Sequence, residues 1–540
     1  MKNPKFQNDF YNKKFDAVII GAGFSGIYML YKLKKLGLSA CIIESGSDVG
    51  GTWYWNRYPG ARCDTWSMEY SYQFSETLQQ EWEWSEKYAS QPEILKYAQH
   101  VVNRFNLKKH IFFNKKVTSV VFNENLQNWN INTDTNDSFI SDFCIMATGC
   151  LSEINAPKFQ GFDLFQGEIY HTGKWPKYNV IFKNKKIGII GTGSSAIQAI
   201  PIIANEAKKL FVFQRTPNYT IPAYNTTLDS KLVETIKSDY KELRQKAKMT
   251  RGGTAIFKLN EEDTFDVTTE ERQREYESRW QTGGGGFIGA YQDLLTNEKA
   301  NKTASNFVRS KIFEIVDDKK TAELLSPTNI IGCKRLCVDT DYYKTFNKPN
   351  VNLVDVNKNT IESITPNGIK IKNQSFDLDM IIFATGFDAM TGALLNIDIQ
   401  GKNQISLSSK WKNGPRMYLG LQIEGFPNLF TITGPGSPSV LSNMIVSIEQ
   451  HVEWISDCIK YMNKNNLKQI EAELEAENQW VDHVNEVASK SLRSTCNSWY
   501  IGANVPGKPR VFMPYIGGVP TYKKICDEIV DNGYQGFRFS

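Results

Sequence analysis

Two glycine-rich segments constrain the fold of this chain more than any other feature. Gly21-Ala-Gly-Phe-Ser-Gly26 and Gly191-Thr-Gly-Ser-Ser-Ala196 both match the G-x-G-x-x-G/A pattern of dinucleotide-binding turns. Each follows an apolar segment typical of a buried parallel strand, residues 15–20 and 186–190, and precedes a helical pattern. One such motif is weak evidence. Two in this context predict an α/β chain with two Rossmann-like dinucleotide-binding domains.

Length and composition limit the other possibilities. A chain of 540 residues is too long for one core, so we expect several domains. The net charge is only +5, and basic residues alternate with acidic ones, so we expect no nucleic-acid partner. The nine cysteines are scattered and form no C-x-x-C pair, which argues against a metal site or a disulfide framework and favours a cytoplasmic location. Residues 1–16 lack the apolar region of a signal peptide, and no apolar run predicts a membrane span.

The first motif predicts a site for FAD or NAD. Gly21 permits the tight turn, Gly23 lets the backbone approach a pyrophosphate, and Gly26 allows close helix packing. The helix N-terminus, which includes Ser25, supplies N–H groups to the phosphates. Glu44 ends the next strand, where an acid accepts hydrogen bonds from a ribose 2′-hydroxyl and disfavours a 2′-phosphate. The alternative is that Glu44 is a solvated turn acid.

The second motif predicts a site for NADPH. Its phosphate-binding turn comprises Gly191, Gly193, Ser194, Ser195 and Ala196. The following strand, residues 210–213, is followed by Gln214, Arg215 and Thr216, where the first site has an acid. A guanidinium pairs well with a 2′-phosphate and has no comparable role at a bare hydroxyl. The alternative is a solvated arginine at the end of a strand.

The segment between residues 50 and 64 is glycine-punctuated and aromatic, which is more typical of a binding loop than of a linker. Spacing alone makes Asp64 a turn or N-cap acid before Thr65 and Ser67. Likewise, Lys334 and Arg335 taken alone would be two surface cations before a strand.

Other segments complete the layout. Residues 229–325 contain charged helical stretches, whose charges are most simply solvated faces, around a glycine loop at 283–286. Pro201 should kink or end the helix that follows the second motif. Two buried strands end in Ala-Thr-Gly, at 147–149 and 384–386, which we interpret as crossings between domains.

Residues 165–176, FQGEIYHTGKWP, lie between the two motifs. Their spacing, F-x-G-x-x-x-H-x-x-x-W-P, resembles the signature of the Baeyer-Villiger monooxygenases, flavoenzymes that use NADPH and dioxygen to convert ketones to esters or lactones. The resemblance covers nearly the whole chain and is closest to the phenylacetone, steroid and cyclohexanone monooxygenases. Lys177 departs from it, since the family commonly has an acid there. His171 has no partner at metal spacing, which favours packing between domains over a direct chemical role.

The resemblance also implies roles for individual residues. Those placed at the flavin are Thr52, Trp53, Trp55, Tyr70, Val117 and Met444. Lys334 would reach the NADP 2′-phosphate, and Trp499 would lie on the nicotinamide nucleotide. Arg335 would stand over the flavin, paired with Asp64.

The reaction of the family implies a catalytic role for the Arg335–Asp64 pair. NADPH reduces FAD, dioxygen forms a C4a-peroxyflavin, and this peroxide attacks the ketone carbonyl, with sulfoxidation as a side reaction. The peroxide must stay deprotonated, which requires a cation such as Arg335 that does not release a proton.

Two rival functions remain open. An N- or S-hydroxylating flavin monooxygenase shares both nucleotide sites but lacks the WP ending of the linker and a Lys-Arg pair with these roles. A nucleotide-binding redox sensor would not turn over at all. The physiological ketone cannot be read from the sequence, and we expect a monomer or a weak homo-oligomer.

The expected domain order follows from these segments. The FAD domain comprises residues 1–150 and 385–540. The linker and first part of the NADP domain span 151–222, a helical insertion spans 223–328, and the NADP domain resumes at 329–384.

Overall fold

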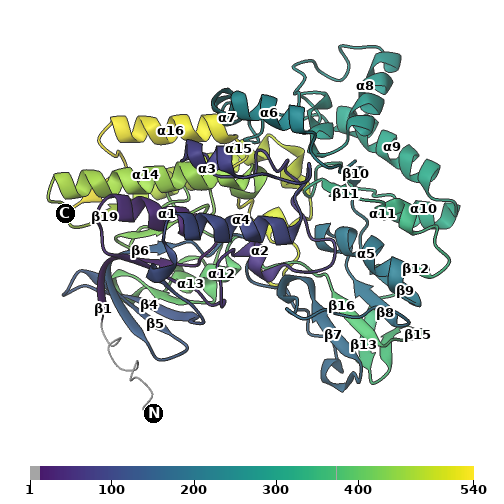
Figure 1. Cartoon of the computed structure of the whole chain (residues 1–540), viewed down its shortest axis with the longest axis horizontal. Coiled ribbons are helices and arrows are strands. Elements are labelled where there is room, and N and C mark those ends of the chain that lie inside the picture. Colours follow the sequence, from purple (N-terminus) through teal and green to yellow (C-terminus); the bar gives the residue numbers. More distant parts are fainter. Residues whose placement is uncertain (1–12, 373) are drawn as a thin grey trace.

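The structure is a computed structural model that describes residues 13–372 and 374–540. Its two largest sheets lie in neighbouring halves of the molecule, with a group of helices beside them (Figure 1). The expected lack of a signal peptide in residues 1–16 falls mostly outside the described residues. Within the described ranges, no helix is long and apolar enough to cross a membrane.

The first sheet has the strand order β17-β4-β5-β6-β1-β2-β3, with β18 also paired to β6. Its strands are β1 (Lys13–Ile20), β2 (Ala40–Ile43), β3 (Ile111–Phe112), β4 (Val117–Asn123), β5 (Asn128–Thr133), β6 (Ser138–Met146), β17 (Asp398–Gln400) and β18 (Leu429–Thr431). Parallel pairing sets Ile20 opposite both Ile43 and Met146. The segments that follow these three residues therefore emerge at one edge of the sheet.

Helices from both ends of the chain cover this sheet (Figure 1). They are α1 (Phe24–Lys35), α3 (Glu76–Glu81), α4 (Gln91–Arg104), α14 (Met444–Lys464), α15 (Leu474–Ser489) and α16 (Val519–Asp531). Helix α1 packs against α14, and one hydrophobic core joins residues of α1, α4 and α14. Smaller elements in this half are α12 (Gly392–Leu395), α13 (Leu407–Lys410) and the pair β19 (Ile470–Ala472) and β20 (Phe537–Phe539).

The second sheet is entirely parallel, in the order β12-β9-β8-β16-β7. Its strands are β7 (Glu168–His171), β8 (Lys186–Ile190), β9 (Lys209–Gln214), β12 (Val351–Asp355) and β16 (Met380–Phe383). Three antiparallel strands form a separate small sheet: β13 (Ile361–Thr365), β14 (Gly368–Ile371) and β15 (Gln374–Asp377).

Helix α5 (Ser194–Glu206) follows β8 and continues for five residues beyond Pro201. Of the two expected effects, Pro201 does not end this helix, and a kink stays a prediction. A proline removes one backbone donor, but Ile200 and Ile203 are fully buried. Their packing holds the following turn in helical form.

The helices of the insertion do not share a single hydrophobic core. The chain leaves and returns through a short parallel ribbon, β10 (Thr220–Pro222) and β11 (Cys337–Asp339). Between them lie α6 (Ser230–Ser238), α7 (Tyr240–Lys248), α8 (Thr269–Thr282), α9 (Glu298–Ile315) and α10 (Lys319–Leu325), with α11 (Tyr342–Thr345) after the ribbon. Tyr240 of α7 joins the core of the first half, whereas α8 and α9 build a core of their own with β10. Gly283–Gly286 lie in the bend after α8, as expected.

Two charged residues of the insertion depart from the expected solvated faces. Arg244 is 5% exposed and donates to the backbone oxygen of Glu69 (2.9 Å) and to Ser71 Oγ (2.7 Å). Arg279 is 8% exposed and pairs with Glu275 at 2.6 Å. These guanidiniums join helices to neighbouring loops, which helical charge patterns alone do not reveal.

Helix α14 buries an acid, Glu449, whose Oε1 accepts a 2.6 Å hydrogen bond from the Gln73 backbone N–H. Its Oε2 has no hydrogen-bond partner within the described part of the chain. Burial raises the pKa of Glu449 to about 7, and the charge of Glu453 adds to the increase. The carboxyl is therefore protonated in the folded chain at pH values where the unfolded chain has released its proton.

This difference predicts a pH-dependent stability. The contribution of Glu449 is complete below pH 4.5 and is lost as pH rises through about 7, because the folded pKa is the higher one. The shift corresponds to a loss on the order of 3 kcal/mol. Urea denaturation at pH 5 and pH 8 should show a smaller loss of stability in Glu449→Gln than in the unmodified protein. Equal losses in the two proteins would contradict the assignment.

Candidate active site

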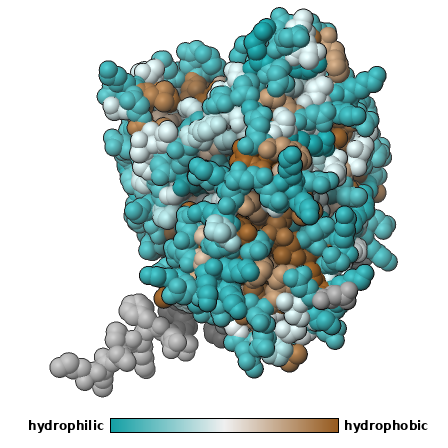
Figure 2. Space-filling view, turned by 90° about the vertical axis from the view of Figure 1, so that its right-hand side faces the viewer, coloured by the Kyte–Doolittle hydropathy of each residue, from teal (hydrophilic) through white to brown (hydrophobic). Residues whose placement is uncertain are grey.

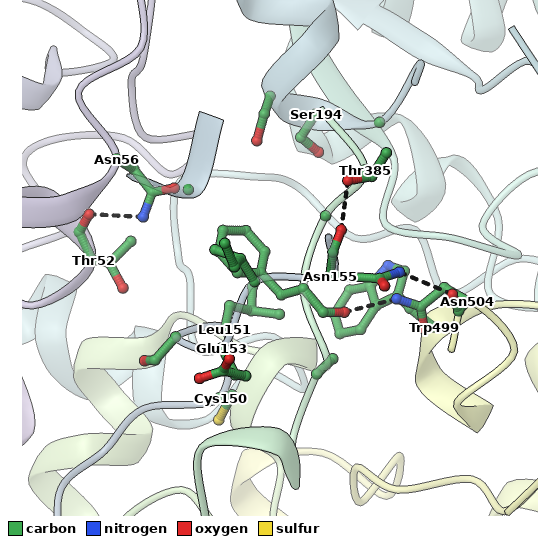
Figure 3. A pocket seen from close by; sticks show the side chains of 18 of the residues that line it. Thr52, Asn56, Cys150, Leu151, Glu153, Asn155, Ser194, Thr385, Trp499 and Asn504 are labelled. Carbon is green, nitrogen blue, oxygen red and sulfur yellow. Dashed lines mark hydrogen bonds between the residues drawn. The ribbon is translucent and has the colours of Figure 1, made fainter. Parts of the chain in front are cut away.

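A cavity of about 2220 Å³ opens where the carboxyl edges of the two sheets meet. It is lined by the residues that follow β1, β2 and β6 in the first sheet and β8, β9 and β16 in the second. Every residue that the sequence assigns to catalysis or cofactor binding lines it, except Gly26 and Ala196. Figure 3 shows Thr52 and Asn56 on one side, Ser194 and Thr385 on another, and Trp499 with Asn504 on a third.

The first glycine motif makes a tight contact with the end of β6. Gly21 has φ +106°, and a Cβ there would lie 2.6 Å from the backbone oxygen of Ala147. A Cβ at Gly26 would lie 1.9 Å from the backbone oxygen of Gly21. Gly26 therefore permits close packing of α1 without itself facing the cavity, which explains its absence from the lining.

Glu44 is built into this motif, so the alternative of a solvated turn acid was wrong. Its side chain is 4% exposed. Oε2 accepts a 2.6 Å hydrogen bond from the Ala22 backbone N–H, and Oε1 accepts another of 2.6 Å from Gly46. Burial raises the pKa of Glu44, while these two hydrogen bonds oppose the increase.

The aromatic loop follows and forms α2 (Thr52–Trp55). Trp53 Nε1 donates to Tyr70 Oη at 3.1 Å, which fixes both rings at the cavity wall. The Asn56 amide donates to the Thr52 backbone oxygen at 2.9 Å (Figure 3). The loop thus presents polar and aromatic groups beside the first glycine motif, as expected of a binding loop.

The second motif repeats the contact of the first. Gly191 has φ +116°, and a Cβ there would lie 2.4 Å from the backbone oxygen of Ala384. Ser194, at the start of α5, and Thr216, after β9, both line the cavity.

Two cations, Arg215 and Lys334, lie near each other at this second cradle. Neither has an ion pair within residues 13–372 and 374–540. Burial lowers the pKa of Lys334, Cys333 opposes the decrease, and the positive charge of Arg215 adds to it. Two like charges without a carboxylate partner are costly unless an anion joins them, so the pair marks an anion-binding position.

Arg335 and Asp64 form a bidentate ion pair across 271 positions of sequence. Arg335 Nε donates to Oδ2 at 2.6 Å and Nη2 donates to Oδ1 at 2.8 Å, while Nη1 donates to the Val440 backbone oxygen at 2.9 Å. Burial alone would raise the pKa of Asp64, but the charge and hydrogen bonds of Arg335 outweigh it and lower the pKa. The carboxylate is thus committed to Arg335 and is not the N-cap that spacing alone favoured.

Comparison with known proteins agrees with this arrangement. The family model for pyridine nucleotide-disulphide oxidoreductases matches residues 18–303. Cyclohexanone 1,2-monooxygenase of Acinetobacter sp. is 41% identical over 97% of this chain and 96% of its own length. A Baeyer-Villiger monooxygenase of Pseudooceanicola batsensis is 40% identical over 96% of this chain and 95% of its own.

Solved structures give the same result. Oxidized steroid monooxygenase bound to NADP has a TM-score of 0.93 and 46% identity, covering 98% of this chain and 99% of that one. OTEMO in complex with FAD and NADP has a TM-score of 0.94 and 39% identity, covering 97% and 99%. The chain belongs to the Baeyer-Villiger monooxygenase family.

The histidine of the family's linker signature lies outside the large cavity. His171 lines a smaller one of about 380 Å³. Its Nδ1 accepts a 3.0 Å hydrogen bond from the Gly173 backbone N–H, so Nε2 carries the proton and donates to Thr385 Oγ1 at 3.2 Å. Burial lowers the pKa of His171, which keeps it neutral. These contacts favour the positioning role in this Baeyer-Villiger monooxygenase.

Sequence reasoning missed a network on the far side of that histidine. Thr385 Oγ1 donates to the Asn155 backbone oxygen at 2.6 Å, and the Asn155 amide donates to the Asn504 backbone oxygen at 3.0 Å (Figure 3). The Asn504 amide donates to the Phe387 backbone oxygen at 2.7 Å. The network joins segments after both Ala-Thr-Gly turns to the C-terminal region. In the sequence, only the two Ala-Thr-Gly turns indicate that these segments approach each other.

Lys177, which departs from the family pattern, reaches the first half from the linker. Its Nζ donates to Ser47 Oγ at 2.6 Å and lies 5.0 Å from the centroid of the Tyr54 ring. An acid could not make this cation–π contact. The linker is therefore attached to the loop after β2 by a cation–π contact that an acid at this position would not provide.

Proposed function

We propose that this chain is an FAD-containing, NADPH- and dioxygen-dependent Baeyer-Villiger monooxygenase that converts ketones to esters or lactones, with sulfoxidation as a side activity. The observation that carries the proposal is the bidentate Arg335–Asp64 pair, which lies in a cavity shared by two dinucleotide cradles. FAD, when bound, supplies hydride acceptance and dioxygen activation.

The first cradle fits FAD. Gly21, Gly23 and Ser25 line the cavity at the N-terminus of α1, where unpaired backbone N–H groups would meet a pyrophosphate. Glu44 faces the cavity with a carboxylate suited to ribose hydroxyls. Trp53, Trp55 and Tyr70 offer aromatic surface along the same wall, with Val117 and Met444 as apolar contacts for the flavin ring.

The second cradle fits NADPH. Gly193, Ser194, Ser195 and the N-terminus of α5 would hold its pyrophosphate. Arg215 and Lys334 would bind the 2′-phosphate, since they are the two unpaired cations of this cradle, with Thr216 beside them. Trp499 would lie along the nicotinamide end.

Arg335 and Asp64 would control the reacting oxygen. The guanidinium keeps its proton at all relevant pH values, because the Asp64 charge raises its already high pKa. It can therefore stabilise a deprotonated oxygen nucleophile without protonating it. Asp64 fixes the guanidinium plane through two hydrogen bonds. His171 positions the linker between the halves without contacting the cavity.

Purified protein should be yellow, with one FAD per chain. It should oxidise NADPH in an oxygen-dependent manner, faster with a ketone present, and yield the ester or lactone. The measurement is a ketone panel with product identification, with amines and sulfides assayed in parallel.

A colourless protein that cannot be reconstituted with FAD would contradict the cofactor assignment. Products from amines or sulfides with none from ketones would favour an N- or S-hydroxylating monooxygenase. Lack of ketone-stimulated NADPH oxidation would favour a redox sensor.

Domain division, location and assembly also remain proposals. We propose an FAD domain of residues 1–150 and 385–540, an NADP domain of 151–222 and 329–384, and an insertion of 223–328 in a cytoplasmic enzyme. Figure 2 shows a largely hydrophilic face on the side of the second sheet, with hydrophobic residues gathered in its lower middle. We propose a monomer or a weak homo-oligomer, which analytical ultracentrifugation would distinguish.

A further inference from the structure

Two cysteines from distant segments line the same wall of the large cavity. Cys333 lies in the turn before Lys334, and Cys496 follows the 3-10 turn Leu492–Thr495. Their residues are 3% and 7% exposed. Neither sulfur takes part in the catalytic arrangement described above, yet a small molecule in the cavity can reach both.

Hydrogen bonds hold the two segments together. Arg493 Nε donates to the Gly332 backbone oxygen at 3.0 Å, directly before Cys333. The Cys496 backbone N–H donates to the Arg493 backbone oxygen at 3.4 Å, so the 3-10 turn brings Cys496 back over Arg493. The Cys496 thiol also lies 3.5 Å from the Leu492 backbone oxygen. Cys333 and Cys496 thus lie on the two segments that the Arg493 contact joins, and their side chains interact with each other.

The two thiols differ in their chemistry. Interaction with the Cys496 side chain lowers the pKa of Cys333 to about 7 despite burial, with help from Lys334 and Arg493. The same interaction raises the pKa of Cys496. Cys333 is therefore the nucleophile of the pair, and Cys496 remains a thiol that can react with an oxidised partner.

Cys150 provides a contrast on the same cavity. Its thiol donates to the Thr433 backbone oxygen at 3.1 Å. Burial raises the pKa of Cys150 to about 11. It shares the cavity but is held as an unreactive thiol, and so serves as the matched control.

We propose that Cys333 and Cys496 form a peroxide-oxidisable pair that closes to a disulfide at the NADP side of the cavity. The Cys333 thiolate attacks hydrogen peroxide, forming a sulfenic acid and releasing hydroxide. The Cys496 thiol then attacks that sulfur, forming the disulfide and releasing water. Peroxide is reduced by two electrons, and each thiol is oxidised by one. The bond would tie the turn that carries Lys334 and Arg335 to the segment that carries Trp499.

The proposal is tested by treating the folded enzyme with peroxide and analysing its tryptic peptides by mass spectrometry. The experiment needs neither NADPH nor ketone, so its outcome is independent of the proposed function. The FAD-loaded protein is treated with hydrogen peroxide at pH 8, above the pKa of Cys333, then blocked with N-ethylmaleimide and digested with trypsin. Cys333 and Cys496 fall in peptides 321–334 and 494–510, each with one cysteine. A linked species of these two peptides should appear with peroxide and disappear with dithiothreitol.

Variants decide which sulfurs react. Cys150→Ser should still form the linked peptide, whereas Cys496→Ser should leave Cys333 as a sulfenic or higher acid. Absence of the linked peptide in the unmodified protein, or oxidation of Cys150 at the same peroxide concentration as Cys333, would overturn the proposal. Both readings come from the unmodified protein, so the conclusion stands even if a variant fails to fold.

Discussion

Arg335→Ala should abolish ester formation while leaving reduction by NADPH in place. The guanidinium is the cation that lies in the cavity with its plane fixed by Asp64, so its loss leaves the oxygen nucleophile free to become protonated. Removing one preorganised charge of this kind typically lowers rates by about 10²- to 10³-fold. Both cradles are built from other residues, so FAD and NADPH binding should persist. NADPH oxidation should then release hydrogen peroxide, and some sulfide oxidation should survive.

The decisive measurement is ester yield per NADPH consumed, alongside the rate of anaerobic reduction. Arg335→Lys is the informative companion variant, because an ammonium cannot make the bidentate pair with Asp64 and also fails to reach Val440 in the same plane. It should therefore fail as well. An ester yield near that of the unmodified protein in Arg335→Ala would disprove this role, even though the family assignment would stand.

Removing Arg215 and Lys334 together should reverse the preference for NADPH over NADH. Each cation would make a charge-assisted contact with the 2′-phosphate, worth about 1.5–3 kcal/mol. One loss corresponds to about 10- to 100-fold in kcat/KM for NADPH, and the double variant should lose more than either single one. The change should fall mainly on KM, because the phosphate lies far from the transferred hydride. Kinetics with NADH should change little.

Lys209→Ala supplies the control for this series. Lys209 begins β9 and Arg215 directly follows its end, so the control removes a cation at the opposite end of the same strand. It should leave both KM values unchanged. If the Arg215 and Lys334 variants keep the NADPH preference, the 2′-phosphate is recognised by other residues.

The sequence predicted the elements that repeat a local pattern. In each cradle, the glycine motif, its flanking strands and the residue after the second strand, Glu44 or Arg215, lie within about 30 residues of one another. Periodicity and turn chemistry act over that range. The strands β1, β8 and β9 accordingly begin and end within two residues of the positions expected.

Local sequence patterns could not predict contacts between residues that are far apart in the chain. The partnership of Asp64 with Arg335 came from the family resemblance alone, since spacing made one a cap and the other a surface cation. The burial of Arg244 and the continuation of α5 beyond Pro201 depend on neighbours from other segments. The three-residue strands β10 and β11 are too short to carry a pattern of their own.

The two Ala-Thr-Gly turns connect the two halves and contact the two glycine motifs. Ala147 and Ala384 each press a backbone oxygen against the first glycine of a nucleotide motif, and the chain changes halves directly after each one. Any swing of one half against the other must flex these turns, and such flexing would deform the adjacent phosphate cradle. A bound dinucleotide would therefore restrain the Ala-Thr-Gly turn beside it. Because that turn leads into the other half, binding of each cofactor would limit the movement of one half relative to the other.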